Sequence, residues 1–167
     1  MTRLIPTAEM TLGPFFPREF AEGANDLAQG SSGEIIEITG RVSELDGKAL
    51  DNVIVEIWQA DAAGRFDNPA FPGWGRAATD AQGNYRFRTI RPGAAPGRAA
   101  HVNFLILYSG LMRQLQTVMF FENAADPVLN AVPQPARARV IAQAVNKTCY
   151  RFDIRLRGGE ETPFFDD

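Results

Sequence analysis

Residues 53–58 read VIVEIW, and this stretch decides the fold class of the chain. It is rich in β-branched residues, which favour strands, and successive side chains of a strand point to opposite faces of a sheet. We therefore expect Val55 and Ile57 on one face of a strand and Trp58 on the other face. The run YRFRTI at residues 85–90 alternates in the same way. Both stretches predict strands of a sheet.

Further short apolar or alternating runs lie on either side of these two, with turn residues between them. Strands are expected at residues 34–42, 75–79, 101–108, 115–121 and 150–156. The Asp-Gly pair at 46–47 is typical of a hairpin turn, and the segment 80–84 would join its two flanking strands as another hairpin. Pro135 predicts a short helix over 136–145, after an irregular stretch at 123–133. This pattern predicts a mainly β fold, an antiparallel β-sandwich with one short helix.

Length and composition suit a single soluble domain. The chain has 167 residues, of which 45% are hydrophobic and 22% charged, so most of it is expected to fold. Residues 1–33 have few periodic apolar positions and read as an extended N-terminal arm, followed by the sandwich at 34–167. A net charge of -3 disfavours a nucleic-acid partner, and the longest apolar run is too short to cross a membrane. One cysteine and no signal-like segment suit the cytoplasm.

Phenylalanines often stand in adjacent pairs, at 15–16, 120–121 and 164–165. The two members of such a pair on a strand point to opposite faces, so they cannot all enter one core. We expect some of them to form a protein–protein interface. The alternative is that the chain packs apolar side chains on both sides of an edge of the sandwich.

Several motifs resemble those of the intradiol ring-cleaving dioxygenases. The stretches EIWQADAAG at 56–64 and GNYRFRTIRPG at 83–93 carry the resemblance, with Gly75-Arg76 and Thr79-Asp80 between them. Within that family the chain resembles a subunit that lacks metal and pairs with an iron-bearing subunit. The motifs for this are TLGPF at 11–15, NAADPVL at 123–129, YRFDIR at 150–155 and ETPFFD at 161–166.

The resemblance also locates the metal ligands of the catalytic members, which hold a ferric ion with two tyrosines and two histidines. Phe66 stands at one tyrosine position, and Ala94 or Ala95 stands at the other. Asn103 replaces the second histidine, and only His101 is kept. Phenylalanine and alanine have no donor atom and asparagine is a poor ligand for ferric iron, so we expect no metal on this chain.

The residues that remain have ordinary structural interpretations. His101, at the start of a strand, is expected to be buried and hydrogen-bonded, and Arg98 to form a salt bridge or lie on the surface. Trp58 and Trp74 are expected to be core or interface aromatics. Tyr108 is not expected to bind iron, since no second donor lies near it in the pattern.

The resemblance implies a subunit without catalytic residues in an iron(III) intradiol dioxygenase. The partner subunit, of the same fold, would carry the iron, and a higher oligomer of such pairs is expected. The reaction would be cleavage of 3,4-dihydroxybenzoate or a related catechol by O2 to a cis,cis-muconate. The substrate pocket would be lined from this chain by Thr11, Gly13, Pro14, Phe15 and Ser109.

Two points leave alternatives open. Ser109 stands where related subunits carry an arginine that can face a substrate carboxylate, and serine cannot form that bidentate pair. Arg113 would compensate only if the chain turned, so the catechol could differ or be bound by the partner alone. The second interpretation of the chain is a metal-free β-sandwich module that binds a small molecule.

Overall fold

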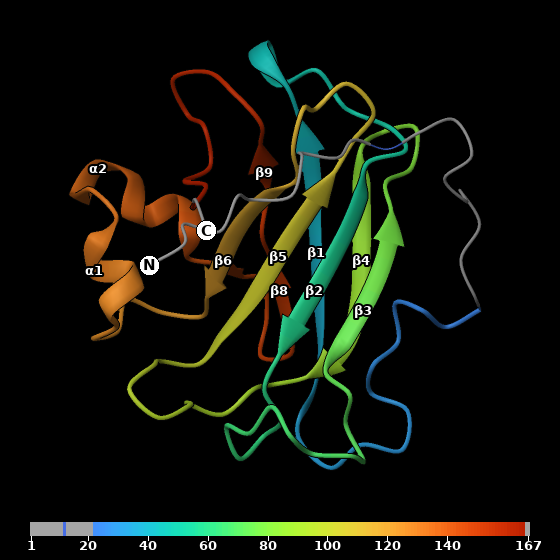
Figure 1. Ribbon diagram of the computed structural model, residues 1–167, viewed down its shortest axis with the longest axis vertical. Coiled ribbons are helices and arrows are strands. Elements are labelled where there is room, and N and C mark those ends of the chain that lie inside the picture. The colour runs from blue at the N-terminus through green and yellow to red at the C-terminus, as the bar shows by residue number, and fades with distance from the viewer. Residues whose placement is uncertain (1–11, 13–21, 166–167) are drawn as a thin grey trace, which may run out of the picture.

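The computed structural model describes residue 12 and residues 22–165, which form two facing β-sheets (Figure 1). The first sheet has the order β4-β1-β8-β7, and β9 also pairs with β1. The second sheet has the order β3-β2-β5-β6. The strands of the first sheet are β1 (Ile35–Ser43), β4 (Asn84–Ile90), β7 (Gln143–Ala144), β8 (Cys149–Arg151) and β9 (Ile154–Arg155). Those of the second are β2 (Ile54–Gln59), β3 (Trp74–Ala78), β5 (His101–Leu107) and β6 (Leu115–Phe120).

The predicted fold class, a mainly β sandwich, is confirmed. All pairings in the second sheet are antiparallel, whereas β1 of the first sheet is antiparallel to β4 and parallel to β8 and β9. The predicted hairpin around 80–84 is wrong, because β3 pairs with β2 and β4 pairs with β1. The segment therefore crosses from one sheet to the other.

The main core lies between the two sheets. Val55 and Ile57 point into it from β2, Phe87 from β4 and Phe104 from β5, all at most 2% exposed. Trp58 points the other way and is 55% exposed, as the alternation in 53–58 predicts.

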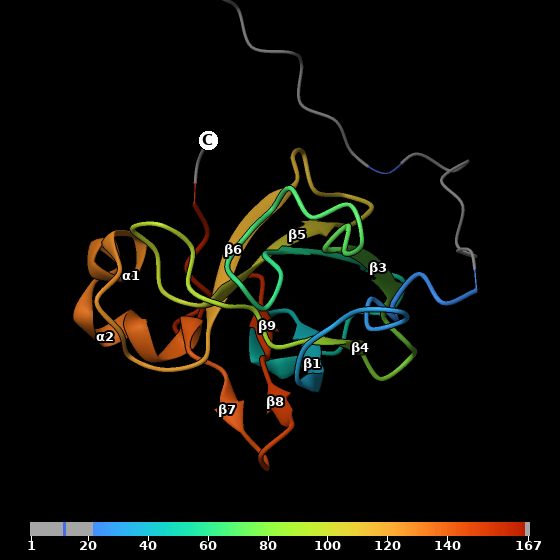
Figure 2. The same cartoon turned by 90° about the horizontal axis from the view of Figure 1, so that it is seen from below.

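A second, smaller core lies on the other side of β6. It contains Val118 and Phe120 of β6 together with Leu129, Val132 and Val140 from the helical segment. That segment consists of α1 (Pro127–Ala131), α2 (Gln134–Arg137) and the 3-10 turn η2 (Ala138–Val140), and it lies beside β6 (Figure 2). The other 3-10 turn, η1 (Leu45–Gly47), contains the expected Asp-Gly turn.

The helix predicted at 136–145 is wrong in its second half. The helical turns end at Val140, and Gln143 already belongs to β7. The cause is tertiary pairing, because the N–H of Ala142 donates to the carbonyl of Phe120 at 2.8 Å. The helix α1 lies in the stretch expected to be irregular.

Two phenylalanine pairs divide their members between the two cores. Phe121 packs in the main core and Phe120 in the second, and Phe164 and Phe165 divide in the same way. These pairs follow the alternative stated above, packing on both sides of a sandwich edge, rather than the expected interface. The pair at 15–16 lies outside the described residues.

The last part of the predicted arm ties the two sheets together. The N–H of Arg76 in β3 donates to the carbonyl of Ala24 at 2.9 Å, and the N–H of Leu27 donates to the carbonyl of Arg88 in β4 at 2.8 Å. Leu27 is buried in the main core. The division of the chain into an arm at 1–33 and a sandwich at 34–167 stays a prediction. Among the described residues no helix is long and apolar enough to span a membrane.

Candidate functional site

The positions singled out as former metal ligands meet at one end of the sandwich. Phe66 lies in the loop after β2, Ala95 lies in the loop after β4, and His101 and Asn103 begin β5. Gln59 at the end of β2 pairs with Val102, so the two loops and the start of β5 share the lower end of the molecule in Figure 1.

The two loops pack against each other through their backbones. The N–H of Gly93 donates to the carbonyl of Asp61 at 2.9 Å. A Cβ atom on Gly64 would lie 2.0 Å from the carbonyl oxygen of Ala94, and Gly64 has a φ of 79°. Both the space and the left-handed backbone require glycine there. The sequence therefore fixes the approach of the loop with Phe66 to the loop with Ala95.

Asp61 holds the loop that carries Phe66. One carboxylate oxygen accepts the N–H groups of Ala63 and Arg65, each at 2.9 Å. The other accepts Nδ2 of Asn68 at 2.8 Å and the Arg65 guanidinium. The pKa of Asp61 is lowered to about 2, and the largest cause is the hydrogen bond from the Arg65 N–H. Burial acts to raise this pKa, whereas the other hydrogen bonds lower it further. The carboxylate is therefore charged at neutral pH.

His101 is buried and already hydrogen-bonded, as expected. It is 5% exposed, and its Nδ1 lies 2.7 Å from the carbonyl oxygen of Ala99. A carbonyl can only accept, so Nδ1 carries the hydrogen and Nε2 carries the lone pair. Burial lowers the pKa of His101, with Arg98 adding to the effect and Ala99 and Asp126 opposing it. The ring is therefore neutral at pH 7.

The surroundings of His101 are aromatic rather than metal-binding. The ring of Phe66 lies 6.4 Å from the imidazole and that of Phe120 lies 6.0 Å from it, between centroids. Asn103 donates its side-chain amide to the carbonyl of Trp58 at 3.2 Å. The donor set of Phe66, Ala95, His101 and Asn103 offers one good ligand for ferric iron, so these residues do not fit the ion.

No group of three or more His, Cys, Asp and Glu side chains that could hold a metal ion occurs within the described part of the chain.

Arg98 forms a salt bridge, one of its two expected roles, and its partner is Asp126 of the motif at 123–129. The Arg98 Nε donates to the Asp126 carboxylate at 2.7 Å, and the N–H of Ala99 donates to it at 2.9 Å. The same carboxylate caps α1 by accepting the N–H of Val128 at 2.8 Å. Asp126 thus connects the segment before His101 to the helical segment.

The comparisons with known proteins agree with this geometry. The family described as "Dioxygenase" matches residues 12–99. The chain is 34% identical to the protocatechuate 3,4-dioxygenase alpha chain of Burkholderia cepacia, with 99% of this chain and 100% of that one covered. It is 39% identical to the beta chain from the same organism, with 78% and 68% covered. The chain belongs to the intradiol ring-cleaving dioxygenase family.

A solved structure of that family has the same fold. The dioxygenase domain of a dioxygenase–carbohydrate-binding protein fusion from Streptomyces sp. SirexAA-E superimposes with a TM-score of 0.65. It is 25% identical, and the match covers 95% of this chain and 100% of that domain. Intradiol dioxygenases use iron(III), and the loss of its ligands from this chain stays a prediction.

Of the predicted substrate-pocket residues of this intradiol dioxygenase chain, only Ser109 belongs to the described part, and it does not lie at the end with His101. Ser109 is exposed in the turn between β5 and β6, at the opposite end of β5 (Figure 1). Seven strand residues separate the two ends by roughly 20 Å. Thr11, Gly13, Pro14 and Phe15 lie outside the described residues. The role of all five residues stays a prediction.

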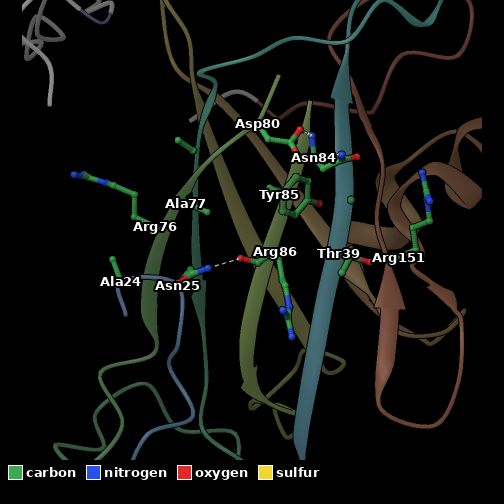
Figure 3. A pocket seen from close by; sticks show the side chains of 12 residues that line it. Ala24, Asn25, Thr39, Arg76, Ala77, Asp80, Asn84, Tyr85, Arg86 and Arg151 are labelled. Atoms are coloured by element: carbon green, nitrogen blue, oxygen red, sulfur yellow. Dashed lines mark hydrogen bonds between the residues drawn. The ribbon is translucent and has the colours of Figure 1, made fainter. Parts of the chain in front are cut away.

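A groove of about 660 Å³ lies away from both places, among β1, β3, β4 and residues 24–25. Its three arginines form ion pairs, Arg76 with Glu56, Arg86 with Glu37 and Arg151 with Asp153. Figure 3 shows these arginine side chains pointing away from one another rather than toward a common point. The groove therefore offers no converging charged groups, and we assign it no function.

Proposed function

We propose that this chain is the non-catalytic alpha subunit of an iron(III)-dependent intradiol dioxygenase similar to protocatechuate 3,4-dioxygenase. The observation that carries the proposal is the set of residues at the ligand positions. The loops with Phe66 and Ala95 and the start of β5 with His101 and Asn103 still meet, yet only His101 can bind iron. The full-length likeness to an alpha chain supports the same assignment.

The partner in this proposal is a beta subunit of the same fold, which carries the iron. The relative in Burkholderia cepacia is named as separate alpha and beta chains, and this chain is similar to both. A higher oligomer of such pairs would follow. The single cysteine suits a reducing cytoplasm, where we place the assembly.

The reaction proposed for the complex is cleavage of 3,4-dihydroxybenzoate or a related catechol by O2 to a cis,cis-muconate. The partner's iron would supply the redox chemistry. This chain would shape the substrate pocket with Thr11, Gly13, Pro14, Phe15 and Ser109, and it would perform no step of the reaction itself.

The test is to purify this chain alone and together with a co-expressed beta-type chain, and to measure iron content and catechol cleavage in each sample. We expect stoichiometric iron and activity only in the complex. Stoichiometric iron in this chain alone would contradict the ligand argument. A stable monomer that never binds an iron-bearing chain would instead favour the metal-free binding module.

A further inference from the structure

The exposed aromatic side chains of this protein gather on one face. Of the aromatic residues that the structure describes, three are exposed: Trp58 at 55%, Trp74 at 46% and Phe66 at 44%. Trp58 and Trp74 are direct partners across β2 and β3, on the face that points away from the main core. The rings of Trp58 and Phe66 lie 6.1 Å apart. We call Trp58, Phe66 and Trp74 the aromatic patch.

Two charges on the strands of the aromatic patch neutralise each other. Glu56 and Arg76 form an ion pair between β2 and β3, and their side chains are only 13% and 26% exposed. The Arg76 guanidinium lies 5.2 Å from the centre of the Trp74 ring, and Trp74 Nε1 donates to Glu56 at 3.4 Å. A partner covering this surface would therefore contact large apolar rings, and it would not have to bury an unpaired charge of Glu56 or Arg76.

The aromatic patch is also fixed before any partner arrives. The two tryptophans stand on paired strands, and Phe66 is carried by the loop that Asp61 holds through several hydrogen bonds. A rigid surface loses little conformational entropy on binding, and tryptophans in such settings contribute most to interface affinity.

We propose that the aromatic patch is the surface on which this chain binds the iron-bearing chain of its own fold. The proposal rests on the proposed function and adds the place of contact. Two related chains commonly associate face to face about a twofold or pseudo-twofold axis. This chain is similar to both chains of one two-chain enzyme, so a partner of its own fold is the occupant that the comparisons favour.

The shape of the aromatic patch separates this occupant from a polysaccharide. The planes of Trp58 and Phe66 stand at 89° to each other, so these two rings do not form a flat platform. Sugar rings stack on coplanar aromatic faces, whereas a protein surface can interlock with perpendicular rings.

The experiment compares the wild type with Trp58→Ala/Trp74→Ala, each co-expressed as the full chain with a beta-type chain. The affinity of the purified chains is then measured by sedimentation. We expect binding at least about 100-fold weaker in the variant.

Leu45→Ala/Val145→Ala is the matched control, because Leu45 and Val145 are exposed apolar side chains outside the aromatic patch, at 48% and 59% exposed. Its affinity should equal that of the wild type. Trp58→Phe/Trp74→Phe keeps the rings and should retain more binding than the alanine variant, which separates lost contact from misfolding.

The outcomes separate this inference from the proposed function. Equal partner affinity in the alanine variant and the wild type would overturn the aromatic patch as the interface and leave the alpha-subunit assignment standing. A wild type that binds no iron-bearing chain would overturn both. Self-association or retention on insoluble cellulose that the alanine variant loses, with partner binding unchanged, would assign the patch to a second copy or to a polysaccharide and overturn the inference.

Discussion

Asp61 shows how one side chain organises this end of the molecule. Its carboxylate accepts N–H groups from Ala63 and Arg65 and the amide of Asn68, and its own carbonyl accepts from Gly93. These contacts hold the loop of Phe66 against the loop of Ala95. The hydrogen bonds of this buried aspartate hold the loop without any metal ligand from Phe66.

Replacing Asp61 by asparagine should lower the melting temperature in a pH-dependent way. The pKa of the carboxyl is lowered to about 2 from an ordinary value of 3.8. A depressed pKa stabilises the fold fully above 3.8, and this contribution is lost as the pH falls toward 2. Thermal melts of wild type and Asp61→Asn should therefore differ most at pH 7 and converge between pH 4 and pH 2. Asp67→Asn, at an exposed position of the same loop, is the control and should follow the wild type at every pH.

Single residues differ in how far the sequence predicts them. The positions predicted as former ligands were identified from the motifs that flank them, and the structure does bring two of them, Phe66 and His101, together, while their role stays a prediction. The hydrogen bond of His101 was expected, but its acceptor, Ala99, follows only from the local backbone path. The partnership of Arg98 and Asp126 joins residues far apart in the chain, and nothing local to either residue points to the other.

Among the elements, α1 depends on its first residues. It spans five residues, which is too short to be stable alone, so its cap and its packing decide whether it forms. Asp126 caps it, and Leu129 is buried in the second core. Burial acts to raise the pKa of Asp126. The pKa is nevertheless lowered, because the carboxylate accepts hydrogen bonds from the Arg98 guanidinium and from the backbone N–H groups of Ala99 and of the capped helix.

Replacing Asp126 by alanine should destabilise the protein by about 3 kcal/mol, because the variant loses both a helix cap and a buried charge-assisted pair. Urea unfolding followed by circular dichroism measures this change. Glu160→Ala, which removes an exposed pair with Arg139, is the comparison and should cost less than about 1 kcal/mol. Equal effects of the two substitutions would show that the Asp126 contacts add nothing beyond a surface ion pair.

The strands were more predictable than the helical segment for a physical reason. Alternation identifies a strand from its own residues, and it located β2 and β4 together with the outward face of Trp58. The end of the helical segment is set by Phe120, whose carbonyl accepts from Ala142 in a distant part of the chain. For α1 a local signal existed, since aspartate followed by proline is a common helix start, but the surrounding residues lack periodicity.

At the scale of the whole molecule, one sheet connects the proposed interface with the predicted pocket residue. The aromatic patch lies near the start of β5, and Ser109 lies beyond its end, roughly 20 Å away. A standard interface of about 800 Å² per partner has a diameter of this order, so one bound chain could cover both. The sequence predicted Trp58 and Trp74 only as core or interface aromatics and Ser109 as a pocket residue, without relating them in space. Their relative positions along one sheet could not be predicted, because they depend on the order of the strands. Alternation of apolar and polar residues identifies strands but does not give their order.

Replacing Ser109 by arginine should change substrate preference in the proposed complex. An arginine there could pair with a substrate carboxylate in a bidentate manner, which serine cannot. We expect kcat/KM for 3,4-dihydroxybenzoate, relative to that for unsubstituted catechol, to rise about tenfold, equivalent to about 1.4 kcal/mol. Steady-state oxygen uptake measures it, with Ser109→Ala as a control that keeps the wild-type ratio. An unchanged ratio in Ser109→Arg would place this residue away from the carboxylate.

The parallel pairing of β1 with β8 and β9 has a consequence for how the protein is made. β1 begins at Ile35, and its neighbours on one side come from residues 149–155 near the other end of the chain. During synthesis β1 therefore waits with one edge open until residues 149–155 have left the ribosome. Open strand edges template aggregation. A ribosome that stalls before residue 149 thus releases a truncated chain with an unpaired strand edge. We expect such truncated chains to aggregate and to be the main targets of protein quality control.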